Sequence, residues 1–426
     1  MELAILFIAL FALLILGVPV AFSLLGASIA TLLYLDIPVI IAVQRLSAGI
    51  NVFALMAIPF FIFAGDLMYR TGIAHRLILL AEAVLGRTRG GLGQVNVGAS
   101  MMFGAVSGSA VASVSALGST MIPMMESRGY HRDYAVNVTC TAAILGLIIP
   151  PSHNMIIYAA SSGIGVSISD LFVAGILPGI LAGVFLMITA WLVALKRGYP
   201  KGAFPGWSRF ISATVKALPG LLTAIIIIVG ILAGIFTPTE SSAVAIAYTV
   251  LVAAFGYRTL GKSEFQLAVT GAVKTTAMVM FIIGAAAVFG WLLAYMEVPA
   301  RLANGVSMLT NEPAMIMLII IAILLLLGTF MDVAPLIIIT TPIFLPVALS
   351  FGIDPVHFGI VQMLALGIGL VTPPVGSVLF VGAAIGQIRI EDTVRTIWPF
   401  YLALLLALLI IVYIPAITLF LPKMLG

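Results

Sequence analysis

The sequence predicts an all-α polytopic membrane protein built as an inverted repeat, with two re-entrant helical hairpins and two broken helices. Of its 426 residues, 63% are hydrophobic and only 8% are charged, whereas a water-soluble domain is about 25% charged. Apolar runs of about 20 residues alternate with short charged clusters, as in chains that cross a membrane many times. Residues that break helices also recur at a fixed spacing in the two halves. A soluble enzyme, a nucleic-acid-binding protein and a secreted disulfide scaffold are excluded.

The first apolar stretch runs from Leu3 to Leu35 and carries Gly17 and Pro19 near its middle. It has neither a basic leader nor a small-residue cleavage site, so we expect it to remain in the mature protein. Its length allows one long kinked helix or two short helices, and the sequence leaves both open.

The placement of charge orients the chain. Basic residues favour short cytoplasmic loops, so we place five basic clusters inside. They comprise Arg70, Arg76, Arg87 and Arg89; Arg128 and Arg132; Lys196, Arg197, Lys201, Arg209 and Lys216; Arg258, Lys262 and Lys274; and Arg389 and Arg395.

The stretch from Gly91 to Met125 begins and ends on the inside and is broken at Ser107-Gly108-Ser109. A full crossing in both directions needs about 40 residues plus a turn, which this stretch lacks. We therefore expect a re-entrant hairpin whose tip borders a cavity, because non-helical backbone at that depth needs partners from protein or water.

Five crossings follow the first hairpin, and the first of them is interrupted at Pro150-Pro151. Beyond them, a region with Arg301 as its one basic residue is placed outside. It contains a second apolar pair, broken at residues 328–332, which we expect to form a hairpin that enters from the opposite face. A helix broken at Pro373-Pro374 then runs inward, and a last helix over Ile397 to Leu421 returns outward. The five crossings are Tyr134 to Ser161, Leu171 to Leu195, Leu218 to Phe236, Ser241 to Phe255 and Phe265 to Met296, and the second pair is Pro313 to Phe330 and Val333 to Ser350.

The two halves match at a constant offset of 223 residues without a gap. An odd number of crossings between the hairpins turns the second copy upside down. Inverted repeats with discontinuous helices that meet near the membrane midplane are typical of secondary transporters. The matches pair Pro123 with Pro346, Gly129 with Gly352, Gly146 with Gly369, Leu147 with Leu370, Pro150-Pro151 with Pro373-Pro374, and Gly163 with Gly386.

This pattern predicts four segments. Residues 1–90 form scaffold helices and an interfacial arm, and residues 91–195 form the first repeat core. Residues 196–312 form further scaffold helices and a second arm, and residues 313–426 form the second repeat core, which ends in the C-terminal helix.

Each broken point frees carbonyl groups and helix ends that can bind a small cation at depth. Oxygen-only sets of this kind suit Na⁺, although small residues at these spacings can also serve close helix packing. The candidate Na⁺ ligands are Ser107, Gly108, Ser109, Ser113, Gly146, Ile149, Pro150, Gly328, Thr329, Thr340, Thr341, Gly369 and Thr372.

Asp332 is the leading candidate for substrate contact, because an ionisable group at membrane depth is a functional hypothesis by default. Direct contact between Asp332 and a carboxylate would be repulsive unless Na⁺ intervenes, and we prefer the alternative that Asp332 accepts hydrogen bonds from substrate hydroxyls. Glu240 could either cap a helix or contact substrate. The remaining candidates are Ser109, Ser152, Asn154 and Ser377. The four histidines are scattered, so no site for another metal is expected.

Residues 256–263 satisfy the G-x-x-x-x-G-K-S pattern of a phosphate-binding loop. The strand, helix and soluble domain that such a loop needs are missing from the surrounding apolar spans. We interpret the match as chance in a basic loop. An ATP-driven permease domain stays as an alternative from another class, whereas an intramembrane enzyme would need a nucleophile with a base, or a metal set, at depth.

The chain resembles the large membrane subunit of tripartite ATP-independent periplasmic (TRAP) transporters over essentially its whole length. The resemblance rests on Ser107-Gly108-Ser109-Ala110, Gly146 to Asn154, Thr237-Pro238-Thr239-Glu240, Met331-Asp332 and Gly369 to Gly376.

The resemblance implies a multi-pass protein of the bacterial inner membrane that imports organic acids by a Na⁺-driven elevator mechanism. It also implies two partners, a separate small four-helix membrane subunit and a periplasmic substrate-binding protein. The Ser152-His153-Asn154 segment is similar to that of sialic-acid members, and C4-dicarboxylate members are the alternative.

Overall fold

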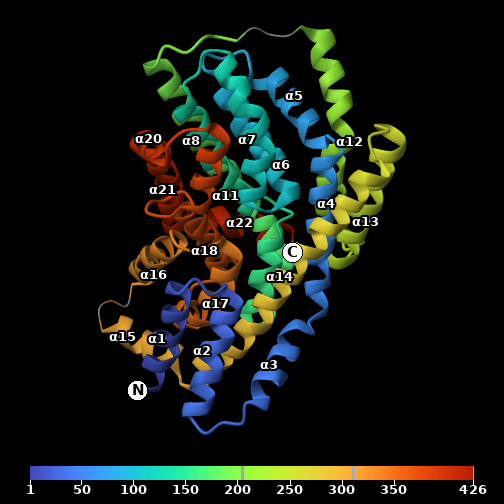
Figure 1. Ribbon diagram of the computed structural model, residues 1–426. Helices are drawn as coiled ribbons and strands as arrows, with labels where there is room; N and C mark the ends of the chain where they lie inside the picture. Colours follow the sequence, from blue (N-terminus) through green and yellow to red (C-terminus); the bar gives the residue numbers. More distant parts are fainter. Residues whose placement is uncertain (203–205, 309, 311, 426) are drawn as a thin grey trace.

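The computed structural model describes residues 1–202, 206–308, 310 and 312–425, except for the side chains of residues 105–107 and 306. Within these ranges the chain is helical, apart from turns and an isolated antiparallel bridge between Arg89 and Lys201 (Figure 1). Six described helices are long and apolar enough to cross a membrane, or up to eight if each of two bent pairs is one span. The predicted all-α membrane fold is therefore confirmed.

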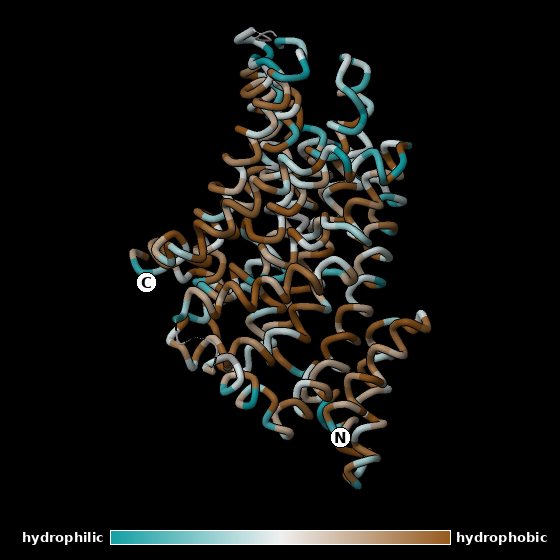
Figure 2. The backbone as a smooth tube through the Cα atoms, turned by 90° about the vertical axis from the view of Figure 1, so that its left-hand side faces the viewer, coloured by the Kyte–Doolittle hydropathy of each residue, from teal (hydrophilic) through white to brown (hydrophobic). Residues whose placement is uncertain are grey.

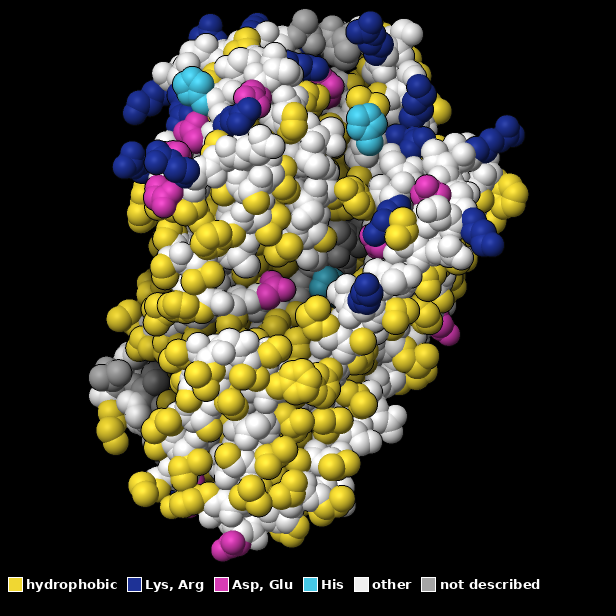
Figure 3. All heavy atoms as spheres, viewed as in Figure 1, with side chains coloured by type: hydrophobic (Ala, Val, Ile, Leu, Met, Phe, Trp, Pro, Cys, Tyr) yellow, Lys and Arg dark blue, Asp and Glu magenta, His cyan; other side chains and the backbone are white. Residues whose placement is uncertain are grey.

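Hydrophobic residues occupy most of the height of the molecule, and hydrophilic residues concentrate at its upper end (Figure 2). Lys and Arg side chains gather at the same end (Figure 3). Because basic residues prefer the cytoplasmic side, we expect this end to face the cytoplasm.

The first apolar stretch forms two short helices, α1 (Glu2–Ile15) and α2 (Val20–Tyr34), which pack against each other. Gly17 adopts φ of +80°, a conformation that favours glycine, and Pro19 is the N-cap of α2. This turn decides between the two alternatives that the sequence leaves open.

Long and short helices surround the two repeats. The long α14 packs against α2, α3, α4 and α17, and α5 packs between α12 and the first hairpin. These elements are α3 (Ile40–Ile50), η1 (Phe53–Met56), α4 (Ala57–Arg70), α5 (Ile73–Leu85), α12 (Trp207–Leu232), α13 (Pro238–Leu251), η2 (Val252–Gly256), α14 (Lys262–Tyr295) and α15 (Val298–Ser307).

The first repeat begins with the expected hairpin, α6 (Gly91–Ser107) and α7 (Ala110–Ser127). The chain reverses at Gly108, whose φ is +61°, and Ser109. The broken helix follows as α8 (Arg132–Ala143), α9 (Leu145–Ile148) and α10 (His153–Ser162), with a bend of 49° at the break. Then α11 (Ile168–Lys196) returns to the basic end.

The second repeat has the same plan. Its hairpin is α16 (Pro313–Gly328) and α17 (Val333–Ser350), and its broken helix is α18 (Pro355–Gly369) and α19 (Ser377–Gly386). The Pro150-Pro151 and Pro373-Pro374 peptide bonds are both cis. A short α20 (Ile390–Thr396) follows, which the sequence did not suggest.

The expectation of a single helix over Ile397 to Leu421 is wrong. The chain forms α21 (Trp398–Tyr413) and a separate α22 (Ala416–Leu425). Pro415 lies between them and has no N–H for the helical ladder, so a continuous helix is disfavoured at this point. The side chains of His357 and Thr418 join α22 to α18 through a contact of 2.8 Å between Nδ1 and Oγ1.

The two repeats interlock at their hairpins. α10 of the first repeat packs against α17 of the second, and α19 of the second packs against α7 of the first. Each hairpin's first arm also packs against the helix that precedes the break in its own repeat, α6 against α8 and α9, and α16 against α18. This reciprocal packing brings the two tips to one region of the interior.

Candidate functional site

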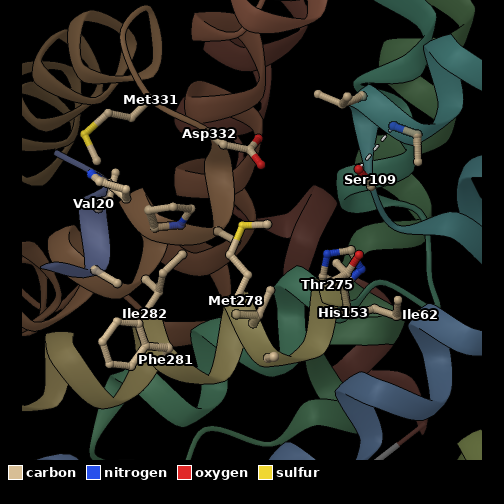
Figure 4. Close-up of a pocket in the computed structure, with 18 of the residues that line it drawn as sticks. Val20, Ile62, Ser109, His153, Thr275, Met278, Phe281, Ile282, Met331 and Asp332 are labelled. Carbon is tan, nitrogen blue, oxygen red and sulfur yellow. Dashed lines mark hydrogen bonds between the residues drawn. The ribbon is translucent and has the colours of Figure 1, made fainter. Parts of the chain in front are cut away.

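A cavity of about 1530 Å³ lies between the two hairpin tips and the helices α1, α2, α4 and α14. Figure 3 shows a hollow near the middle of this face of the molecule. Ser109 of the first tip and Asp332 of the second both line it, and Figure 4 shows their side chains on facing sides. The structure thus brings together two candidate residues that are far apart in the sequence.

At the first tip, Ser109 is the N-cap of α7. Its Oγ accepts a hydrogen bond of 3.3 Å from the backbone N–H of Ala112, which satisfies one of the free donors at the helix start. Gly108 accepts a hydrogen bond of 2.7 Å at its carbonyl oxygen from Nδ2 of Asn154. A Cβ at Gly108 would stand only 2.6 Å from Nδ1 of His153, so the tip fits closely against the start of α10.

The first break places small residues in close contact. Gly104 in α6 meets Gly146 in α9, where a side chain on either residue would strike backbone. Ser152 is fully buried, and its Oγ has no hydrogen-bond partner among the described residues. A buried hydroxyl without a protein partner is explained by a bound water, a bound ion or local strain. Ser113 is also fully buried, Gly146 and Pro150 are buried, and Ile149 is partly exposed.

At the second tip, Asp332 is the N-cap of α17 and accepts a hydrogen bond of 2.9 Å from the N–H of Val333. Its residue is exposed, because the carboxylate faces the cavity (Figure 4). Thr329 accepts a hydrogen bond of 3.0 Å at its carbonyl oxygen from the N–H of Gly376. Each hairpin tip is therefore joined to the region after the break of its own broken helix.

The second break repeats the glycine contact of the first. A Cβ at Gly328 would lie 2.9 Å from Cα of Gly369. The Oγ of Ser377 is buried and has no partner among the described residues. Orphaned serine hydroxyls thus occur after both double prolines, at Ser152 and Ser377.

All four threonines among the candidate Na⁺ ligands have other partners, and the hydroxyl of Thr329 donates to the carbonyl of Leu326 at 2.7 Å. Thr340 receives a hydrogen bond of 2.7 Å from Nε2 of Gln362, and Thr341 donates to Oε1 of the same residue at 3.2 Å. The hydroxyl of Thr372 donates to the carbonyl of Ile368 at 2.7 Å. Thr340 and Thr341 are buried between α17 and α18 and are not among the residues that line the cavity.

Glu240 belongs to the start of α13. Its carboxylate accepts hydrogen bonds from the N–H of Thr237 at 2.8 Å and from the Thr237 hydroxyl at 2.9 Å, and the Thr237 side chain accepts in return from the N–H of Glu240. This is a capping box. The structure therefore gives Glu240 the capping role and does not place it with the cavity residues.

The side chain of Ser107, another candidate ligand, lies outside the described part of the structure; its backbone ends α6. The sequence did not suggest that His153, Asp66 and Arg70 line the cavity. A signal was available for Asp66 and Arg70, because they lie one turn apart in an apolar segment, where ionisable groups are candidates for function. The described residues contain no cluster of three His, Cys, Asp or Glu side chains that could hold a metal.

Comparison with known proteins identifies the family. Residues 7–417 match the model of the "Tripartite ATP-independent periplasmic transporter, DctM component". The chain is 41% identical over 374 residues to a C4-dicarboxylate TRAP transporter large permease protein of Pseudomonas aeruginosa, which covers 88% of this chain and 87% of the relative.

Two further relatives carry other substrate names. A sialic acid TRAP transporter large permease protein of Vibrio cholerae is 37% identical, covering 96% of this chain and 95% of the relative. An isethionate TRAP transporter permease protein of Oleidesulfovibrio alaskensis is 39% identical, covering 96% of this chain and 64% of that longer relative.

A solved structure supports the fold. The YdaH transporter of Alcanivorax borkumensis superposes with a TM-score of 0.63 over 87% of this chain and 86% of that chain, at 14% identity. Together with the apolar helices, the family places the protein in the bacterial inner membrane as a multi-pass transport protein and not as an enzyme. The chain belongs to the DctM component family of tripartite ATP-independent periplasmic transporters, and it is a large permease subunit.

Proposed function

We propose that this subunit imports an organic acid with a Na⁺ gradient as the energy source. The observation that carries the proposal is that two oppositely inserted hairpin tips border one cavity, with Ser109 on one side and Asp332 on the other. Discontinuous helices that meet in this manner supply the ion and substrate sites of secondary transporters.

Sodium would bind at the two breaks. The carbonyl oxygens of Gly108 and Thr329 each accept one hydrogen bond from the described residues named above, and a carbonyl oxygen has two lone pairs. The orphaned hydroxyls of Ser152 and Ser377, which follow the two double prolines in the sequence, add further oxygen atoms. Carbonyl and hydroxyl oxygens without a formal charge fit a small monovalent cation, and unwound backbone is a known source of such ligands. Binding of Na⁺ would hold the tips in the arrangement that receives substrate.

Substrate would bind in the cavity between the tips. Asp332 would accept hydrogen bonds from hydroxyl groups, and Ser109 would contact the same molecule. The names of the relatives support an anionic organic acid as the class of substrate and favour neither of the two specific candidates. Sialic acid offers many hydroxyl donors to Asp332, whereas an unsubstituted C4-dicarboxylate offers none, so the role of Asp332 separates the two.

An elevator movement fits the position of the cavity. Its walls come from residues 1–90 and 196–312 on one side and from the two repeat cores, 91–195 and 313–426, on the other. If the cores slide as one body against the scaffold, the tips move along the scaffold wall and the cavity changes the side to which it opens. Membrane lipids would cover the exposed apolar faces of the outer helices.

The family also implies two partners for this chain, a small membrane subunit and a periplasmic substrate-binding protein. The isethionate relative carries the name DctMQ permease protein, and this chain covers 64% of its length. A small membrane subunit would bind the large one to complete the membrane unit.

Uptake in proteoliposomes tests the proposal. The purified chain is reconstituted with the small subunit, the binding protein is added, and uptake of radiolabelled sialic acid and of succinate is followed under an inward Na⁺ gradient. We expect uptake of one of them that disappears when Na⁺ is replaced by K⁺ and that needs no ATP. Uptake driven by ATP without a Na⁺ gradient would instead support the ATP-driven permease.

A further inference from the structure

The wall of the cavity opposite the hairpin tips carries an ion pair. Asp66 and Arg70 lie one turn apart on α4, and Nε of Arg70 is 3.0 Å from Oδ2 of Asp66. Both residues line the cavity, and their side chains remain 24% and 30% exposed, respectively. The pair is therefore accessible from the space in which the tips of the hairpins lie.

The ion pair fits closely against α14. A Cβ at Gly271 would lie 2.8 Å from Oδ2 of Asp66 and 3.9 Å from Nη2 of Arg70. Only a residue without a side chain leaves the carboxylate in its place, and Gly271 and Thr275 of α14 line the cavity beside the pair. The two charges are thus held between two helices and do not form a mobile surface contact.

Arg70 is the one Lys or Arg among the described residues that line the cavity, where the acidic side chains are Asp66 and Asp332. An organic anion that enters this space meets two carboxylates, so it needs a cation to offset them. The Arg70 guanidinium uses Nε for Asp66, which leaves the edge formed by Nη1 and Nη2 without a hydrogen bond among the described residues. That edge can donate two parallel hydrogen bonds to a carboxylate or a sulfonate.

We propose that Arg70 binds the anionic group of the transported molecule and that Asp66 is a positioning residue that fixes the guanidinium through Nε. The inference rests on the proposed transport function and assigns a division of roles within the cavity. Arg70 on α4 recognises the negative charge, and Asp332 on the second hairpin recognises the hydroxyl-bearing part. A substrate must therefore reach from the wall to the tips while it is bound.

Charge rescue at a single cysteine tests this assignment. Cys140 is the natural cysteine of the chain and is fully buried, so Arg70→Cys adds one accessible thiol. The variant is reconstituted with its partners, and Na⁺-driven uptake of the anion that the wild type transports is measured. Thiosulfonate reagents then add a trimethylammonium, a sulfonate or a neutral methyl group. Arg301→Cys serves as the matched control, because Arg301 is exposed on α15 and is not among the cavity residues.

We expect Arg70→Cys to lower uptake at least about tenfold, since charge-assisted hydrogen bonds are the strong ones in such a site. Modification with the trimethylammonium reagent should raise uptake several-fold above that of unmodified Arg70→Cys, and the sulfonate and methyl reagents should not raise it. Arg301→Cys should transport like the wild type with every reagent. Wild-type uptake by Arg70→Cys, or equal recovery with all three reagents, would overturn the assignment.

A second comparison separates binding from a structural role. If Arg70 only neutralises Asp66, the double variant Asp66→Asn/Arg70→Gln should recover uptake relative to Arg70→Gln, because no unpaired charge is left. If Arg70 binds the anion, the double variant should remain as impaired as Arg70→Gln. Absence of uptake in the wild type would refute the proposed function, whereas normal uptake in an Arg70 variant would refute only the present inference.

Discussion

Asn154 donates a hydrogen bond of 2.7 Å from Nδ2 to the carbonyl oxygen of Gly108, and so joins the tip of the first hairpin to the helix that follows the first double proline. Asn154 is 2% exposed. The bond fixes the position of the backbone turn that we propose to bind Na⁺.

Substitution of Asn154 by alanine should therefore lower both the stability of the protein and its apparent affinity for Na⁺. Loss of the donor leaves a buried carbonyl with one partner fewer, which costs about 1–3 kcal/mol of stability. We expect a lower unfolding temperature and a higher Na⁺ concentration for half-maximal uptake. Asn51→Ala is the control, because Asn51 is exposed at the end of α3. An unchanged Na⁺ requirement in Asn154→Ala would separate this bond from the ion site.

The contact between Gly328 and Gly369 predicts a severe effect of a single methyl group. In Gly328→Ala the new Cβ would lie 2.8 Å from the carbonyl oxygen of Leu366 and 2.9 Å from Cα of Gly369. Overpacking against backbone costs about 1–3 kcal/mol or more, so the unfolding temperature in detergent should fall. Gly305→Ala is the matched control, since nothing lies within 4 Å of a Cβ at that exposed position. Equal unfolding temperatures for the two variants would contradict the close approach of α16 and α18.

Glu240→Ala should affect stability and leave transport intact. The variant loses the two hydrogen bonds that the Glu240 carboxylate accepts from Thr237, whereas the Thr237 side chain still accepts from the N–H of residue 240, so half of the capping box is lost. Thermal unfolding should register this loss, while uptake at saturating substrate and its Na⁺ dependence should match those of the wild type. A large fall in uptake with an unchanged unfolding temperature would return Glu240 to the list of substrate contacts.

Sequence reasoning predicted the membrane fold, the two hairpins and the inverted repeat because these depend on local properties. Apolar length, basic loops and the double prolines are visible in the chain itself. The side-chain partners are not, because they depend on packing between distant elements. In the sequence, Thr340 and Thr341 have no visible partner, and only the packing of α18 against α17 brings Gln362 to them. Asp66 likewise lies in an apolar run and Arg70 in a basic cluster, and only the packing of α14 against α4 shows that the two are held together. The break between α21 and α22 has a local signal, because Pro415 has no N–H with which to continue a helix.

Accessibility of the two tips tests the central claim, that both border one cavity at membrane depth. Ala112→Cys and Met331→Cys place single reactive thiols beside Ser109 and Asp332 without removing either, and both positions line the cavity. A membrane-impermeant thiosulfonate is applied to reconstituted transporter with and without Na⁺ and substrate. We expect both thiols to react slowly and to become protected together when Na⁺ and substrate are present. Rapid labelling of both thiols that neither Na⁺ nor substrate changes would contradict the account.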